Sequence, residues 1–355
     1  MEHYWGQVKR RVKGLAMVSR GIVPELFVSR KVLDNMHLAA QQYLEDETGE
    51  AMVGMLVDAD GKSRIYDIDT ISPDVAYRSS HSFQQGSDWQ GDVFLWLKEN
   101  WDLYCQQGLD SEGQVITRPW LNPLIHLGDW HKQPGNMIAP SFGDLQTALS
   151  FLDDLADNQY VQDFLLVPIL TLDQYQTENL QPEDEALESN YLLLEKDNFR
   201  AGRVDWWYIH RSARIFQPII PQVMDELECP ALPDYPWHLK DTAKYQSEID
   251  ALQNANLFAF LLTWQTGSKA PMDVVFAVVA ESWRHVMIII TRPDYPASAP
   301  LVYRSTYQPV GEDVYAWFAT IWQSAEALKI PSDWHWIEDK KLVDLIQHME
   351  AHLGW

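Results

Sequence analysis

The segment His131-Lys-Gln-Pro-Gly-Asn-Met-Ile-Ala-Pro-Ser-Phe-Gly-Asp144 is the most informative stretch of this 355-residue chain. It follows a short apolar run at 124–130 that predicts a strand, and a helical pattern begins near Asp144. Taken singly, Trp130-His131 is typical of a core strand, and Ser141 followed by Asp144 is typical of a helix N-terminus. Taken together at these spacings, the residues favour a functional site.

The regions on either side of this segment predict a mixture of helices and strands. Upstream we expect helices at 31–46 and 91–107, a strand that includes Ala51 to Met55, and a turn at 58–61. Downstream we expect buried strands at 163–172 and 204–210. We also expect an acidic, solvated loop at 181–189 and a proline-containing linker or entry strand at 226–240.

The central segment resembles the JAMM signature of the JAB/MPN metallopeptidases, which reads His-x-His-Pro followed by Ser-x-x-Asp. Pro134, Ser141 and Asp144 fall at matching positions, and ten residues separate 133 from 144. Upstream, Glu47 precedes a strand and lies seven residues before Gly54, as the family's glutamate does. The resemblance covers roughly residues 20–225.

The resemblance implies a zinc hydrolase. In that family two imidazoles and a carboxylate leave one position of the zinc open for water, and the metal lowers the pKa of that water. By resemblance His131 and Asp144 would bind Zn²⁺. Glu47 would be the general acid and base, and Ser141 would donate a hydrogen bond to the oxyanion.

The chain departs from the signature at Gln133, where the family has its second histidine. An amide oxygen is a poorer zinc donor than imidazole, so zinc affinity should fall by more than the ~10–100-fold that a second-shell change costs. Three explanations remain open. The domain is a pseudoenzyme, or substitute ligands such as His126 and Asp129 complete the site, or Gln133 is an inactivating substitution.

Other polar residues are expected to be structural. We expect His37, His81 and His210 to be packed or surface histidines, because most histidines bind no metal. Glu50 is interpreted as a strand residue and not as a second base.

The C-terminal part carries a second resemblance. We expect a helix at 241–255, strands at 256–264, 273–281 and 285–292, and helices at 312–328 and 338–353. The turn Tyr295-Pro-Ala-Ser-Ala-Pro300 after the third strand resembles the ubiquitin-conjugating (UBC/RWD) fold, which has a Tyr-Pro-x-x-x-Pro turn there. No cysteine follows Cys229, so this segment has no thiol to carry a thioester.

Composition restricts the partners and the compartment. The net charge of −24 opposes binding to nucleic acid, and the apolar runs are too short to span a membrane. Two distant cysteines make no disulfide framework, and the basic stretch at 9–13 leads into too short an apolar run for a signal peptide. We therefore expect a cytoplasmic protein.

These observations together predict an α+β protein. We expect a JAB/MPN domain at 1–228, with a mixed sheet of the cytidine-deaminase-like kind flanked by helices, and a UBC/RWD-like domain without a catalytic cysteine at 229–355. The two resemblances imply the activity of a zinc-dependent isopeptidase or protease that acts on ubiquitin-like conjugates or precursors, in a bacterial, antiphage-type system. The alternative is a metal-free adaptor that binds ubiquitin-like proteins or conjugation enzymes.

Overall fold

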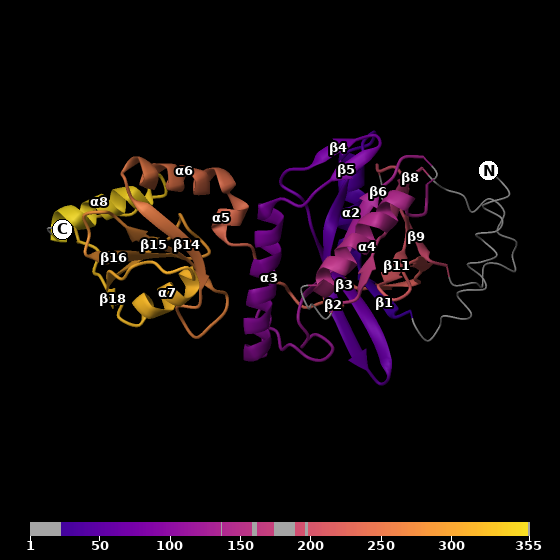
Figure 1. Cartoon of the computed structure of the whole chain (residues 1–355), viewed down its shortest axis with the longest axis horizontal. Helices are drawn as coiled ribbons and strands as arrows, with labels where there is room; N and C mark the ends of the chain where they lie inside the picture. The colour runs from indigo at the N-terminus through magenta and orange to yellow at the C-terminus, as the bar shows by residue number, and fades with distance from the viewer. Residues whose placement is uncertain (1–22, 136, 158–161, 174–188, 196–197, 354–355) are drawn as a thin grey trace, which may run out of the picture. The chain divides into compact units, whose positions relative to one another are not determined.

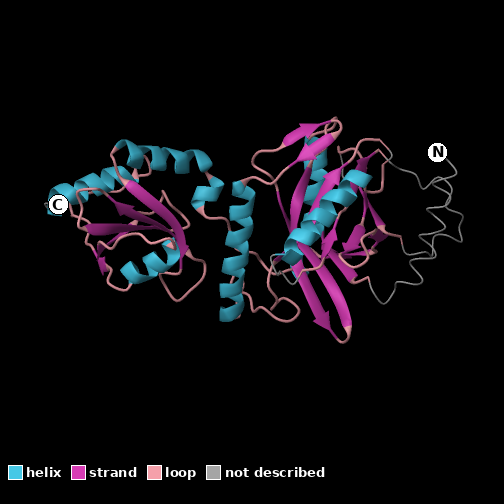
Figure 2. Ribbon diagram, in the orientation of Figure 1, coloured by secondary structure: helices cyan, strands magenta, loops and turns pink. Residues whose placement is uncertain are grey.

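The computed structural model describes residues 23–135, 137–157, 162–173, 189–195 and 198–353. The basic stretch at 9–13 and nearly all of the acidic loop at 181–189 lie outside these ranges. Helices and sheets are both present, which confirms the α+β class (Figures 1 and 2). The chain divides into two compact units, the first formed by residues up to Lys98 with 114–231, the second by 99–113 with 232–355.

The first unit is built on a large mixed sheet with the strand order β12-β11-β7-β6-β2-β3-β1-β13, to which β8, β9 and β10 attach. Its strands β2 and β3 form an antiparallel hairpin, and β6 runs antiparallel to β2 and parallel to β7 and β8. Its elements are β1 (Glu25–Ser29), α2 (Arg30–Gln42), β2 (Gly49–Ala59), β3 (Lys62–Ile71), β4 (Tyr77–Ser79), β5 (Ser82–Gln84), β6 (Ile125–Lys132), α4 (Phe142–Asp157), β7 (Phe164–Leu166), β8 (Ile169–Leu172), β9 (Tyr191–Leu194), β10 (Gly202–Asp205), β11 (Trp207–His210), β12 (Phe216–Pro218), β13 (Pro221–Met224) and the 3₁₀ turn η2 (Glu226–Glu228).

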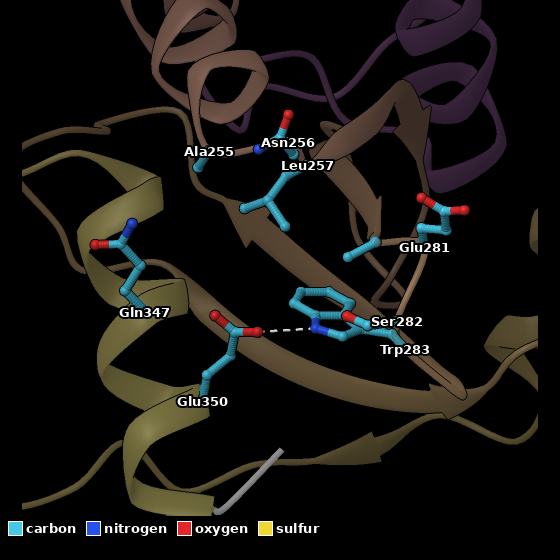
Figure 3. A pocket seen from close by; sticks show the side chains of 9 residues that line it. Ala255, Asn256, Leu257, Glu281, Ser282, Trp283, Gln347 and Glu350 are labelled. Carbon is cyan, nitrogen blue, oxygen red and sulfur yellow. Dashed lines mark hydrogen bonds between the residues drawn. The ribbon is translucent and has the colours of Figure 1, made fainter.

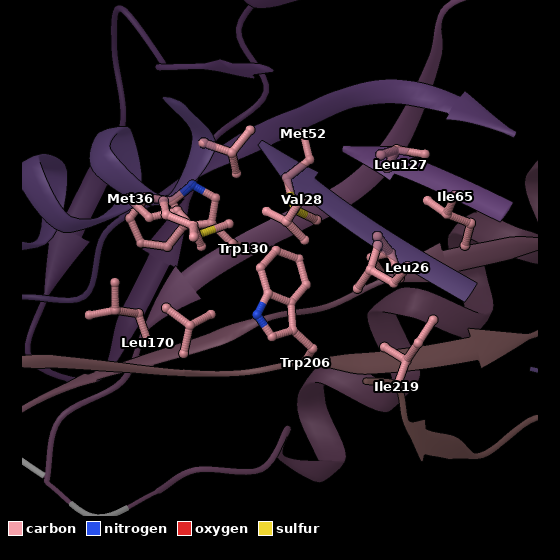
Figure 4. Close-up of a cluster of buried hydrophobic side chains, with 14 of the residues drawn as sticks. Leu26, Val28, Met36, Met52, Ile65, Leu127, Trp130, Leu170, Trp206 and Ile219 are labelled. Carbon is pink, nitrogen blue, oxygen red and sulfur yellow. The ribbon is translucent and has the colours of Figure 1, made fainter. Parts of the chain in front are cut away.

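Helices α2 and α4 cover opposite faces of this sheet. The main core joins α2 to the sheet and includes Trp130 and Trp206, both fully buried (Figure 4). Phe164 and Leu166 of β7 belong to this core, whereas the intervening Leu165 packs with α4. Successive side chains of a strand point to opposite faces, so the two clusters lie on either side of the sheet.

Two local features explain how the strands approach one another. The turn expected at 58–61 is confirmed, because Asp60 and Gly61 have positive φ angles of 53° and 72° between the paired residues Ala59 and Lys62. Gly128 of β6 has φ +127°, and a Cβ atom there would lie 2.1 Å from the carbonyl oxygen of Leu166. Glycine at 128 is therefore required for β7 to pair alongside β6.

Helix α3 (Asp88–Gln107) contains the boundary between the two units. The second unit also contains α5 (Trp237–Lys240), α6 (Thr242–Asn254), β14 (Phe258–Trp264), β15 (Asp273–Val279), β16 (His285–Thr291), β17 (Leu301–Thr306), α7 (Val314–Trp322), β18 (Glu326–Ala327) and α8 (Leu342–Leu353). Its five strands form an antiparallel sheet in sequence order. One core cluster joins this sheet to α6 and α8, and another joins it to α7.

The segment around Tyr295 is tied to two helices of the second unit. The Tyr295 hydroxyl donates to Glu248 Oε1 of α6 at 2.7 Å, and the backbone N–H of Leu342 in α8 donates to Glu248 Oε2 at 2.8 Å. Trp336 Nε1 donates to the Pro296 carbonyl at 2.7 Å. The turn is therefore a packed structural element in which the Tyr295 hydroxyl and the Pro296 carbonyl are hydrogen-bonded.

Several sequence predictions need correction. The single strand expected at 163–172 is two strands, because Pro168 has no N–H to continue a ladder. The expected helix at 312–328 ends at Trp322, and 326–327 form strand β18. Strand β17 was not anticipated. The expected linker at 226–240 contains the short helix α5, in which Trp237 is only 3% exposed.

Candidate functional site

The end of strand β6 places His131 and Gln133 beside each other. The His131 backbone N–H donates to the Pro168 carbonyl at 3.1 Å, and the Gln133 N–H donates to the Leu170 carbonyl at 2.9 Å. These bonds keep the backbone extended past the last residue of β6. Residues 131 and 133 therefore direct their side chains to one face and Lys132 to the other.

Asp144 reaches the same place from the first turn of α4. Its Oδ2 accepts a hydrogen bond from the Ser141 N–H at 2.5 Å, and its own N–H donates to Ser141 Oγ at 3.2 Å. This reciprocal pair caps the helix, as a Ser-x-x-Asp pattern predicts. Ser141 thus has the structural role of a cap, and its O–H hydrogen can still be donated elsewhere.

The side chains of His131, Gln133 and Asp144 converge. Gln133 Nε2 lies 3.0 Å from His131 Nε2 and 3.3 Å from Asp144 Oδ2. His131 Nε2 lies 3.6 Å from Asp144 Oδ1. The sequence spacing predicts that these three positions share one site, and the structure brings their side chains together.

His131 is largely buried, and this burial is the main reason why its pKa is lowered; the charges of Asp144 and Asp129 oppose the shift. The ring is consequently neutral at neutral pH. A neutral imidazole with its hydrogen on Nδ1 presents a lone pair at Nε2, which accepts the hydrogen bond from the Gln133 amide.

Glu47 precedes β2 and is half-buried. Its backbone N–H donates to the Ser79 carbonyl of β4 at 2.8 Å. Its pKa is raised, chiefly by burial and then by the negative charge of Asp144, while His81 and Lys132 act in the opposite direction. The influence of Asp144 indicates that the Glu47 carboxylate belongs to the same electrostatic environment.

Two basic residues that sequence reasoning missed hold the segment that carries Glu47. Lys132 is 4% exposed, and its ammonium group donates to the carbonyl oxygens of Tyr43 and Leu44. Arg78 donates from Nε to Thr48 Oγ1 at 3.1 Å, and its guanidinium lies 4.1 Å from the centre of the Tyr43 ring. No sequence motif distinguishes these two residues from ordinary surface cations.

The proposed substitute ligands bind each other. His126 Nε2 lies 3.1 Å from Asp129 Oδ1, and the His126 ring packs edge-on against Phe151 of α4. This nitrogen is therefore already paired with a carboxylate. Within the described ranges, no group of three or more His, Cys, Asp or Glu residues is placed to hold a metal ion.

The remaining polar predictions concern structural residues. His37 is buried and its Nε2 lies 2.7 Å from the Arg200 carbonyl oxygen, whereas His81 is exposed. His210 lies 3.0 Å from Asp163 Oδ2 near the surface. Glu50 is a buried residue of β2 that accepts hydrogen bonds from Ser72 and from Trp130 Nε1. The three histidines are thus packed or at the surface, as expected, and Glu50 is a residue of strand β2.

With the Gln133 amide in the orientation observed, the side chains at the site do not form a suitable ligand set for zinc. Zinc needs lone pairs from nitrogen, oxygen or sulfur at about 2.0–2.3 Å. His131 and Asp144 can supply two, but Gln133 directs N–H groups toward both of them. An amide N–H has no lone pair to give a metal, so the third position presents a donor of hydrogen bonds instead of a ligand.

A hollow with a volume of about 410 Å³ lies in the second unit. Its lining includes Asn256, Leu257, Glu281, Trp283, Gln347 and Glu350 (Figure 3). Trp283 Nε1 donates to Glu350 Oε1 at 2.8 Å. The carboxylate of Glu350 is thus engaged in a structural bond, and we assign no chemistry to this hollow.

No protein-family model and no curated protein sequence matches this chain. Among the helices of the described residues, none is both long enough and apolar enough to cross a membrane.

Proposed function

We propose that the first unit is a JAMM-like binding module that engages ubiquitin-like proteins without a metal ion, joined to a UBC-like module that also performs no catalysis. The observation that carries the proposal is the Gln133 amide, which hydrogen-bonds His131 and Asp144 where the family binds zinc. The partner class rests on the resemblance of the sequence signatures.

Exposed apolar side chains beside the site support a binding role. Phe142, the first residue of α4 and the neighbour of Ser141, is 71% exposed. Tyr77 of β4, the strand whose Ser79 accepts the Glu47 N–H, is 61% exposed. Exposed aromatic side chains are available to contact another protein, and aromatic residues are enriched in protein interfaces.

The second unit lacks a reactive thiol among its described residues. Cys105 is the one cysteine of this unit, and burial raises the pKa of its thiol to about 11. A thiol with that pKa is almost entirely protonated at neutral pH and is a poor nucleophile. This supports a module that binds or positions a partner.

The test is a binding measurement with immobilised ubiquitin-like proteins that end in a free Gly-Gly. We expect saturable binding that persists in EDTA and weakens about tenfold or more in Phe142→Glu, as for an interface hot spot. An acidic residue is favourable in the first turn of a helix, so this variant should fold. The matched control is Leu227→Glu, since Leu227 is 94% exposed on η2. Binding that EDTA abolishes, or that Phe142→Glu leaves unchanged, would contradict the proposal.

The zinc-dependent isopeptidase is the second candidate, and one observation favours it. The pKa of Glu47 is raised by burial and by the charge of Asp144, as a general acid and base requires. This function would require the Gln133 amide to turn its oxygen toward His131 and Asp144. Zinc-dependent cleavage of a ubiquitin–lysine isopeptide, lost in Glu47→Gln, would support this candidate over the binding module.

A further inference from the structure

The three converging side chains are spaced like the ligands of a metal ion. Gln133 Nε2 lies 3.0 Å from His131 Nε2 and 3.3 Å from Asp144 Oδ2, and His131 Nε2 lies 3.6 Å from the other oxygen of Asp144, Oδ1. Ligands of a tetrahedral zinc with bonds of about 2.0–2.1 Å lie about 3.3–3.4 Å apart. The backbone that positions residues 131, 133 and 144 is therefore compatible with a metal centre, and the obstacle is chemical.

The obstacle is the polarity of the Gln133 amide. Its Nε2 provides hydrogens to two acceptors, the His131 lone pair and the Asp144 carboxylate. With the ring hydrogen of His131 on Nδ1, the opposite orientation would place Oε1 against the Nε2 lone pair and the negative charge of Asp144, which repel it. Gln133 is 5% exposed, so water cannot readily take over these bonds. The two acceptors thus fix the amide with its N–H groups inward.

The Oε1 atom shows what this orientation costs. Among the described residues it has no hydrogen-bond partner, although it is buried. A buried amide oxygen without a partner loses its solvation, so a competing arrangement must be worse for the amide to remain. The opposite orientation of the amide is worse, because His131 and Asp144 would then repel Oε1.

We propose that Gln133 replaces a cation by bridging His131 and Asp144 with its N–H groups, and that this one side chain is what excludes zinc. A single substitution that supplies a lone pair at 133 would then create a three-ligand metal site in the existing fold. This inference rests on the proposed metal-free function and deepens it, because it identifies the residue that removes metal binding.

The experiment measures zinc bound per chain after dialysis of the full-length protein, for the native sequence and for Gln133→His. We expect no stoichiometric zinc in the native protein. The substituted protein should bind one zinc per chain at least about 100-fold more tightly, since a residue that binds the metal directly matters more than one that only hydrogen-bonds a ligand, whose loss changes affinity ~10–100-fold. With Co²⁺ as the probe, the same variant should show the visible absorption of a four-coordinate cobalt site.

Three further variants separate the explanations. Gln133→Leu removes the N–H groups without adding a ligand and should bind no zinc. Gln133→His combined with Asp144→Asn should lose the new site. Gln133→Glu has the shape of glutamine and supplies a carboxylate, so it tests the idea even if the histidine variant fails to fold. Thermal unfolding confirms folding in each case.

Either of two results would overturn the inference. The first is one tightly bound zinc in the native protein. The second is folded Gln133→His and Gln133→Glu proteins that both bind zinc no better than native. The proposed partner binding has its own readout, in which Gly-Gly-terminated ubiquitin-like proteins are tested in EDTA, so failure of one idea is distinguishable from failure of the other.

Discussion

The ammonium group of Lys132 lies 2.8 Å from the carbonyl oxygen of Leu44, two residues after the end of α2. It also donates to the Tyr43 carbonyl. Through these bonds the strand that carries His131 and the segment that carries Glu47 are held together, on the face of β6 opposite to the site. We infer that Lys132 is a positioning residue for Glu47.

Replacing Lys132 with Met should therefore loosen the segment 43–48. The aliphatic part of the side chain is kept, but two carbonyl oxygens lose their donor, which costs about 1–3 kcal/mol of unfolding free energy. Urea unfolding measures this loss, and hydrogen exchange should quicken at 43–48. The exposed Lys62→Met, which removes an ion pair to Glu25, is the control and should change stability by less than about 1 kcal/mol. Equal effects of the two substitutions would argue against the anchoring role.

Asp67 of β3 should make the stability of the protein depend on pH. It is fully buried, and in the described part of the chain neither carboxylate oxygen has a hydrogen-bond partner. Burial, followed by the charge of Asp69, raises its pKa well above the model-compound value of 3.8. Below pH 3.8 the Asp67 carboxyl is protonated in both the folded and the unfolded chain, so its ionisation does not change the free energy of unfolding. As the pH rises, the unfolded chain releases its proton first, and stability falls until the folded pKa is passed.

Asp67→Asn removes this dependence. We expect the variant to be more stable than the native protein at pH 8, by about 1–3 kcal/mol, and nearly equal to it at pH 3.5. Chemical denaturation at the two pH values measures both. A variant that is less stable at pH 8 would show that the charged carboxylate is better solvated than its burial indicates.

Glu248 should be more important for the stability of the second unit than its partner Tyr295. The carboxylate is fully buried and receives hydrogen bonds from the Tyr295 hydroxyl and the Leu342 N–H, with Lys244 Nζ at 3.0 Å. Glu248→Ala leaves those donors and the lysine without their acceptor and should cost about 3–5 kcal/mol. Tyr295→Phe removes one of the bonds and should cost about 1–3 kcal/mol. Unfolding monitored by tryptophan fluorescence would contradict this order if Tyr295→Phe were the more damaging.

His238 of α5 should make the second unit sensitive to acid. Burial lowers the pKa of its imidazole to about 4, from a model-compound value of 6.5. The folded state therefore prefers the neutral ring. Its stability contribution is complete above pH 6.5 and is lost as the pH falls from 6.5 toward 4. NMR titration of the ring should give a midpoint near 4, and His238→Gln should flatten the decrease in stability over this window. A midpoint near 6.5 in the folded protein would exclude this explanation.

Sequence reasoning succeeded where the signal was local. The helix expected at 31–46, which forms over 30–42, the turn at Asp60-Gly61 and the helix that begins beside Asp144 all follow from periodicity, turn chemistry or capping within a few residues. It failed where a distant partner decided the outcome. The two residues of β18 become a strand because they pair with β17, and Trp237 is buried because it packs against Phe276. Neither partner is visible in the sequence around these residues.

The same division applies to the site. The sequence determined which chemical groups are available: an imidazole at 131, an amide at 133, and carboxylates at 144 and 47. Only the tertiary structure decided that the amide points its N–H groups at His131 and Asp144, and that Lys132 and Arg78 hold the segment carrying Glu47. The physical reason is that a hydrogen bond depends on the positions of both partners. Here those positions are fixed by the pairing of β6 with β2 and β8, whose residues are far apart in the chain.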